Sequence, residues 1–345
     1  MKKIPKQNKR LFFSRLLWNK RLNQKHMPHA GYMGNGGDIN LILGINGPGI
    51  NHLTQLLPQA LSNGHYIHHP LTKFEPKLTL SNQGDRLAIP YHKDLTADHP
   101  LNRIYRIYAE ESLAKNNYNL LLLGESDASR GAFLIMKEVH GLLATEALLR
   151  ELQCHVLFYV SDPVILAEQL FSREGLDTTY LDLESEAVMD SRFLKRFFPR
   201  DFRTVLHAYK LIHRLPSGRQ RRVQMKVFTI ALIQHMFRML AARYPELASV
   251  IDFALIENDP KRLEFPLVNW LGPDSLDHTK RLLSGATFTA DGQKSQRWTW
   301  SWPESINAFE ALSSEDVRTA YQLMIDHKLM PDEGKRKTWD ERFAV

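Results

Sequence analysis

A Gly/Pro turn between an apolar run and a helical pattern is the part of the sequence best suited to chemistry. The apolar run, 39–44, predicts a buried strand. Gly44 and Gly49 keep the spacing of the phosphate-binding motif G-x-x-x-x-G-K-[ST], while Ile50 and Asn51 stand where that motif has Lys and Ser or Thr. Glycines let backbone N–H groups approach an anion at the positive end of a helix. The turn is therefore a candidate phosphate site without its own cation, and a purely structural turn is the alternative.

Apolar runs that alternate with helical patterns predict an α/β protein with a mostly parallel sheet covered by helices, in a three-layer α/β/α arrangement. The expected strands are 39–44, 118–124, 154–160 and 252–256, with a weaker candidate at 65–68. The expected helices are 50–62, 103–115, 131–152, 163–172, 186–213, 220–243, 261–270 and 314–327. In such sheets, ligands bind beyond the carboxyl ends of the strands.

Three regions are expected along the chain. Residues 1–37 form a basic N-terminal arm, 38–330 form the α/β domain, and 331–345 form a C-terminal tail. Within the domain, 173–250 contains no convincing strand and predicts a helical insertion between two sheet strands.

Composition narrows the class of protein. The chain has 345 residues, 43% of them hydrophobic, as is typical of a soluble globular protein. Its single cysteine, Cys154, excludes an internal disulfide and a thiolate metal site, so we expect no metal and a reducing, cytoplasmic location.

The positive charge is concentrated in the arm. Nine of the 45 Lys and Arg residues lie in 1–37, which has no acidic residue, so 36 basic residues face 38 acidic residues in the rest of the chain. A net charge of −2 outside the arm predicts no nucleic-acid partner. Leu11, Phe12, Phe13, Leu16, Leu17 and Trp18 could line one side of a short helix. Peripheral contact of the arm with an anionic membrane and packing of the arm on the body are both open.

Polar residues follow each expected strand. They are Glu125-Ser126-Asp127 after the second, Ser161-Asp162-Pro163 after the third and Glu257-Asn258-Asp259-Pro260 after the fourth. Helix capping is the favoured role for the two Asp-Pro pairs, because Asp accepts hydrogen bonds from the first turn and Pro fits the first helical position.

Taken in order, these segments resemble the sulfotransferase family, P-loop-type α/β enzymes that transfer a sulfuryl group from 3′-phosphoadenosine 5′-phosphosulfate (PAPS). The turn Gly47-Pro48-Gly49-Ile50-Asn51 is similar to the family's 5′-phosphosulfate loop. Val160-Ser161-Asp162-Pro163 resembles its Val-Arg-Asp-Pro element, which holds the 3′-phosphate. Further similar segments are 254–260, 263–272, 291–298 and 313–317. The resemblance implies PAPS as the cofactor and a P-loop NTPase-like sulfotransferase fold.

The chain departs from the family pattern where cations are expected. The family's Arg is Ser161, and the Ser expected two helical turns later is Gln169. Loss of two charge-assisted bonds, at about 1.5–3 kcal/mol each, would weaken cofactor binding by orders of magnitude unless other groups compensate. By resemblance, Lys294 and Arg297 are the expected compensating cations. A second basic cluster, Arg214, Arg219, Arg221, Arg222 and Lys226, is either a phosphate clamp or a solvated helix start, and the helix start is favoured.

The acid–base role falls on the residues after the second expected strand. There the family has a Lys followed by Thr or Ser and a His near the acceptor, and this chain has Glu125-Ser126-Asp127. Asp127 or Glu125 could deprotonate the acceptor, or both could belong to a helix cap. His52, His68, His69, His92 and His140 are alternative bases.

Two functions from different classes follow. The first is sulfuryl transfer to a hydroxyl or amine acceptor on a glycan, lipid or small molecule. The second is a degenerate sulfotransferase-fold module that binds or scaffolds without catalysis. A kinase is disfavoured because the turn lacks the Lys that contacts β- and γ-phosphates.

Overall fold

A parallel β-sheet flanked by helices forms the centre of the molecule in the computed structural model, which describes residues 40–47, 49–51, 53–54, 64–68, 133–139, 142–178, 180–253, 260–271, 287–288, 294–295, 311–327 and 329. The strands of the sheet are β1 (Asn40–Gly44), β2 (Gly64–His68), β3 (Phe133–Glu138), β4 (His155–Val160) and β5 (Ala248–Asp252). A separate two-stranded ladder pairs β6 (Thr287–Phe288) with β7 (Lys294–Ser295).

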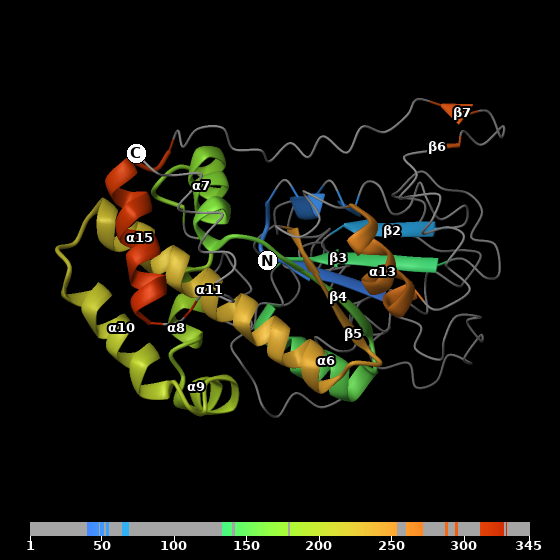
Figure 1. Cartoon of the computed structure of the whole chain (residues 1–345), viewed down its shortest axis with the longest axis horizontal. Helices are drawn as coiled ribbons and strands as arrows, with labels where there is room; N and C mark the ends of the chain where they lie inside the picture. Colours follow the sequence, from blue (N-terminus) through green and yellow to red (C-terminus); the bar gives the residue numbers. More distant parts are fainter. Residues whose placement is uncertain are drawn as a thin grey trace, which may run out of the picture.

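The sheet has the order β2-β3-β1-β4-β5, and every neighbouring pair is parallel (Figure 1). β1 is central, and the chain next adds strands on one side of it (β2 and β3) and then on the other (β4 and β5). Parallel sheets of this kind place a ligand crevice at the carboxyl end of the strand where the order reverses. That strand is β1, so the Gly/Pro turn after it lies at the edge of the sheet where a ligand crevice is expected.

Helical residues follow β1 at 49–51 and 53–54, and the helices with described bounds follow β3 and β4 and precede and follow β5. They are η2 (Leu142–Ala144), α6 (Thr145–Leu152), α7 (Pro163–Glu174), α8 (Asp182–Ala187), α9 (Ser191–Phe197), α10 (Phe202–Arg214), α11 (Arg219–Arg243), η3 (Pro260–Leu263), α13 (Glu264–Leu271) and α15 (Ser314–Asp326). The strand and helix content confirms the α/β class.

The strand predictions met different outcomes. The expected strands at 39–44, 65–68 and 154–160 are present as β1, β2 and β4. The strand expected at 252–256 was placed too far along the sequence. The observed strand β5 ends at Asp252, and Phe253 is already helical. The expected strand at 118–124 lies outside the described residues.

β3 corrects a helix prediction. Residues 131–152 were expected to be one helix, but 133–138 pair with both β1 and β2, and α6 begins only at Thr145. The four apolar residues Phe133–Met136 fit a helical face as well as a buried strand, and the long-range pairing decides between them.

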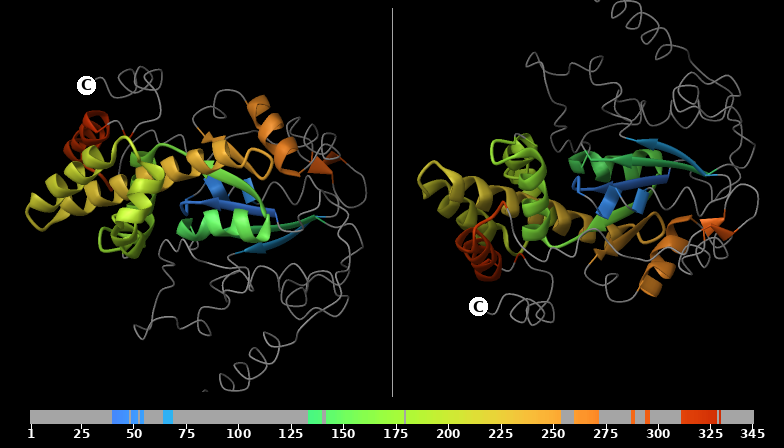
Figure 2. Two further views of the ribbon diagram at one scale, coloured as in Figure 1. Left: turned by 90° about the horizontal axis from the view of Figure 1, so that it is seen from below. Right: turned by 90° about the horizontal axis from the view of Figure 1, so that it is seen from above.

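The stretch 173–250 is helical for most of its length, as expected, and the only part of it in the described sheet is the start of β5 at the edge. α11 is its longest helix and is buried from Val223 to Leu240 against α7, α15 and β5. By length and composition alone α11 could cross a membrane, but 67% of its apolar window is buried in the protein, as in the core helix of a globular protein. The two views in Figure 2 show α11 running from the sheet to the outer helices.

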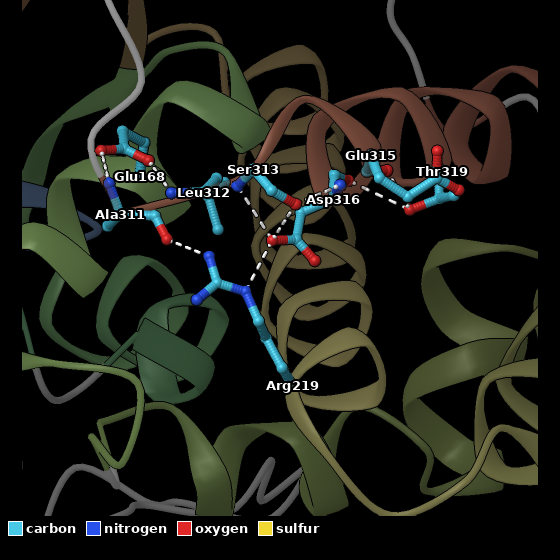
Figure 3. Close-up of polar contacts among 8 residues, drawn as sticks. All are labelled: Glu168, Arg219, Ala311, Leu312, Ser313, Glu315, Asp316 and Thr319. Carbon is cyan, nitrogen blue, oxygen red and sulfur yellow. Dashed lines mark hydrogen bonds and ion pairs between the residues drawn. The ribbon is translucent and has the colours of Figure 1, made fainter.

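α15 and the residues just before it are attached to α7 and α11 by polar contacts (Figure 3). Both carboxylate oxygens of Glu168 on α7 accept backbone N–H bonds, from Ala311 and Leu312, at 2.7 Å each. Arg219, the first residue of α11, donates to the Asp316 carboxylate at 2.7 Å. These contacts join two segments that are more than 90 residues apart in sequence.

Candidate functional site

The turn after β1 is shaped by two close approaches of side chains to glycine. A Cβ on Gly44 would lie 2.8 Å from Ile50 Cδ1 and 3.1 Å from the Tyr159 backbone oxygen. A Cβ on Gly47 would lie 3.1 Å from Gln169 Oε1 and 3.2 Å from Leu166 Cδ2. The glycines therefore let the following helix pack on β1 and let α7 approach the turn.

The predicted loop residues take different places. Gly49, Ile50 and Asn51 are helical, and the Asn51 backbone N–H donates to the Gly47 carbonyl at 3.2 Å. Ile50, which stands in the place of the motif's Lys, is fully buried, so its side chain belongs to the core. Asn51 is half-buried. Pro48 lies outside the described residues.

Lys137 brings a positive charge to this turn from β3. It is 0% exposed, and its ammonium donates to Asn51 Oδ1, the side chain at the motif's Ser/Thr position. Burial, first, and the positive charge of Arg173, second, lower the pKa of Lys137 to about 8, against the opposing effect of Glu138. Lys137 was missed in the sequence because 131–152 was expected to be helical. A short apolar run that ends in Lys-Glu was the available signal.

Tyr180 fixes the end of β3 against the turn. Its hydroxyl donates to the Val139 carbonyl at 3.0 Å and accepts the Asn46 backbone N–H at 3.2 Å. Burial raises its pKa well above the ordinary value, so the hydroxyl stays protonated. One side chain thus connects the segments that directly follow β1 and β3.

α7 is the third element that lies at this turn, after β1 and β3. Asp162 caps this helix, accepting the backbone N–H bonds of Val164 at 2.8 Å and Ile165 at 3.2 Å, which confirms the capping prediction. Ser161 is buried directly after β4. Gln169 faces Gly47, and its buried Oε1 has no hydrogen-bond partner among the described residues.

The structure does not describe the side chains of the remaining predicted site residues. Lys294 lies in β7, and its side chain is not described. Glu125, Asp127 and Arg297 lie outside the described residues, so the acid–base and 3′-phosphate predictions for them stay predictions. No group of His, Cys, Asp and Glu suited to a metal ion occurs within the described ranges.

The second basic cluster belongs mainly to the start of α11. Arg219 pairs with Asp316 at 2.7 Å and Arg222 with Asp177 at 2.7 Å. Lys226 is buried and donates to Asp182 and to the Tyr180 carbonyl. Arg219 and Arg222 are exposed, in agreement with the favoured solvated helix start, but that interpretation is wrong for Lys226, which is buried.

The arrangement can hold an anion. A buried ammonium, a Gly-containing turn and the start of a helix meet at the carboxyl end of the central strand. Because Lys137 is buried, its charge would act on a bound anion more strongly than it would in solution. No protein-family model matches the chain, and no curated protein matches it.

Proposed function

We propose that this site binds the phosphosulfate of PAPS and that the chain is a divergent sulfotransferase with a P-loop-like fold. The observation that carries the proposal is the position of Lys137. The turn itself lacks the motif's cation. Lys137 on the neighbouring strand β3 supplies a cation there, because its ammonium donates a hydrogen bond to Asn51, the residue at the motif's Ser/Thr position. Lys137 would thus compensate for the cation missing from the turn, while Lys294 and Arg297 remain the proposed compensators for the family Arg that is Ser161 here.

The resemblance supports the same role. It implies a Lys at the end of the strand after the first helix, and the run 125–127 has none. Lys137 is the penultimate residue of β3, the neighbour of β1, and is followed by Glu138, Val139 and His140. The Lys-Glu-Val-His run is thus the better counterpart of that element.

In the proposed reaction, an acceptor hydroxyl or amine attacks the sulfur, the bond from sulfur to the phosphate oxygen breaks, and adenosine 3′,5′-bisphosphate leaves. Lys137 would stabilise the negative charge that develops on the departing phosphate oxygen. The acceptor proton would pass to a carboxylate, for which Asp127 and Glu125 remain the candidates. The acceptor class is a glycan, lipid or small molecule.

The alternative function, a binding module without catalysis, is favoured by two observations. Ile50 has replaced the motif's Lys and is fully buried, and Lys137 is engaged with Asn51. A turn closed in this way could be a structural remnant. The proposal and this alternative differ in whether nucleotide binds at all.

Calorimetry with adenosine 3′,5′-bisphosphate tests the proposal. Lys137→Met keeps the side-chain length and removes the charge, so it should weaken binding by about 1.5–3 kcal/mol, roughly 10- to 150-fold. Lys195→Met, which removes an exposed charge on α9, is the matched control and should bind like the wild type.

Two results would contradict the proposal. Equal affinity of the wild type and Lys137→Met, with both proteins folded by thermal melting, would remove Lys137 from the site. An absence of binding by the wild type would favour the non-catalytic module.

A further inference from the structure

The solvent-facing side of α10 carries a row of basic residues. Arg203, His207, Lys210 and Arg214 are all exposed and recur at spacings of four, three and four residues. At 100° per residue they fall within about 60° of arc, along about 16 Å of helix. We call these four residues the basic stripe. Figure 1 shows α10 at the outer edge of the helical part, away from the sheet.

The other side of α10 explains why the stripe faces solvent. Val205, Ala208 and Ile212 are buried, and their helical positions lie opposite the stripe. Packing of this apolar side against the core fixes the rotation of the helix. The basic side is therefore held outward by the fold.

The stripe differs from the other cations of the helical part. Arg196, Arg219, Arg222 and Arg243 each form an ion pair with a carboxylate. By contrast, the Arg and Lys residues of the stripe have no ion pair with any residue in the described ranges. Unneutralised charges that share one helix face create a local positive field that can attract a polyanion.

The wider charge distribution points the same way. Residues 191–243, from α9 to α11, contain 13 Lys and Arg and a single acid, Asp201, a net charge of +12. Since residues 38–345 carry −2 in total, the rest of that region carries −14. The expectation of no nucleic-acid partner rested on the near-zero total, which hides this segregation.

We propose that the basic stripe of α10 binds the phosphate backbone of nucleic acid without reading its sequence. A row of Arg and Lys along one helix is the electrostatic footprint of such binding, and Arg can grip phosphate with two parallel bonds. An anionic bilayer is a poorer match, because interfacial helices bury large apolar side chains in the membrane. In the described residues, the only exposed large hydrophobic side chains are Leu211, at 37%, and Phe265, at 80% on α13.

Fluorescence anisotropy with a labelled DNA duplex of about 20 base pairs tests the stripe in the full-length chain. The triple variant Arg203→Gln, Lys210→Gln, Arg214→Gln should bind about tenfold more weakly or worse at 0.1 M salt, with the slope of log K against log salt reduced by about 3. A matched variant, Lys261→Gln, Arg262→Gln, Arg318→Gln, removes the same charge from exposed positions on η3 and α15. It should retain affinity within about threefold, since its cations would make no phosphate contact.

The basic arm is intact in the wild type and in both triple variants, so a difference in affinity among these three proteins reports on the stripe and not on the arm. Equal losses in both triple variants would reduce the effect to net charge and overturn the proposal. So would unchanged binding by the stripe variant.

The same proteins are mixed with phosphatidylserine vesicles: loss of vesicle binding with intact DNA binding would assign the stripe to a membrane instead. The double variant Arg203→Lys, Arg214→Lys keeps the charge of the stripe, so it should retain most of the wild-type affinity for DNA.

Discussion

At the scale of residues, the enclosed ammonium of Lys137 decides the chemistry of the turn. An ammonium removed from water is costly, and this cost appears as a pKa of about 8 instead of 10.5. Strongly shifted pKa values are frequent at binding and catalytic sites and also occur in structural ion networks. The buried Oε1 of Gln169, which has no hydrogen-bond partner in the described part of the chain, is a second costly polar group at the same turn.

The shifted pKa of Lys137 predicts a pH dependence of stability. Between pH 8 and 10.5 the unfolded chain still binds the proton that the native state has released, so the free energy of unfolding rises with pH across this window. The full contribution is of order 3 kcal/mol, because one pKa unit corresponds to about 1.4 kcal/mol. Lys137→Met lacks it, so the stability advantage of that variant over the wild type at pH 7 should shrink as pH rises to 10.

Urea unfolding at several pH values measures this difference. Lys195→Met serves again as the exposed control, and its difference from the wild type should stay constant. A constant difference for Lys137→Met as well would mean that the ammonium is not desolvated in solution.

Tyr180 is a positioning residue in this description. Tyr180→Phe removes the hydroxyl that connects the Asn46 N–H to the Val139 carbonyl. Both backbone groups lose a partner at a buried site, so we expect a loss of stability of about 1–3 kcal/mol and weaker nucleotide binding. Tyr209→Phe on α10 is the control, because the Tyr209 hydroxyl makes no hydrogen bond that the described structure records. Tighter or equal nucleotide binding by Tyr180→Phe would contradict the positioning role.

At the scale of elements, α7 connects the site to the end of the chain. Its first turn is capped by Asp162 beside the turn of β1, and Glu168 on the same helix binds the segment before α15. α15 has its own capping box, in which Ser313 and Asp316 exchange side-chain and backbone bonds. Burial raises the pKa of Asp316, but hydrogen bonds from Arg219 and Ser313 outweigh burial and hold it below its ordinary value.

Glu168→Gln tests the attachment of α15. The amide can replace only one of the two carboxylate oxygens as an acceptor, so one of the N–H groups of Ala311 and Leu312 loses its partner. We expect the free energy of unfolding to fall by about 1.5–3 kcal/mol. Relative to the wild type, hydrogen exchange should accelerate more in α15 than in the buried middle of α11. Glu315→Gln, in an exposed ion pair with Arg318, should cost less than about 1 kcal/mol. Similar costs for both variants would show that Glu168 does not anchor the helix.

At the scale of the whole molecule, charge is divided among three regions. The arm carries nine cations, the helical stretch 191–243 carries a net +12, and the remaining residues of 38–345 are strongly acidic. The proposed nucleotide site lies at the carboxyl ends of strands β1, β3 and β4, which all belong to the body of the protein. We therefore expect nucleotide binding and association with large polyanions to depend on different residues.

Deletion of residues 1–37 should separate these properties. The thermal midpoint and the affinity for adenosine 3′,5′-bisphosphate should be retained, because the site is built from 40–253. Association with anionic vesicles should fall and lose its salt dependence, since the arm holds nine cations without an acid. A folded truncated protein that no longer binds nucleotide would place part of the site in the arm.

The sequence alone determined the features that depend on neighbouring residues. The apolar run before Gly44, the turn that follows it and the Asp162-Pro163 cap are local patterns, and each was predicted at its correct place. Periodicity also indicated that most of 173–250 is helical. In these segments, local propensity and the tertiary structure agree.

Only the tertiary structure decided where the charge of the site comes from. Lys137 is 86 residues from Asn51 in sequence, and no local pattern links them. The apolar run 133–136 suits a helix or a strand equally, and pairing with β1 and β2 makes it a strand. Strand pairing is a long-range interaction between backbone groups. It therefore placed at the turn a cation that the sequence of the turn itself lacks.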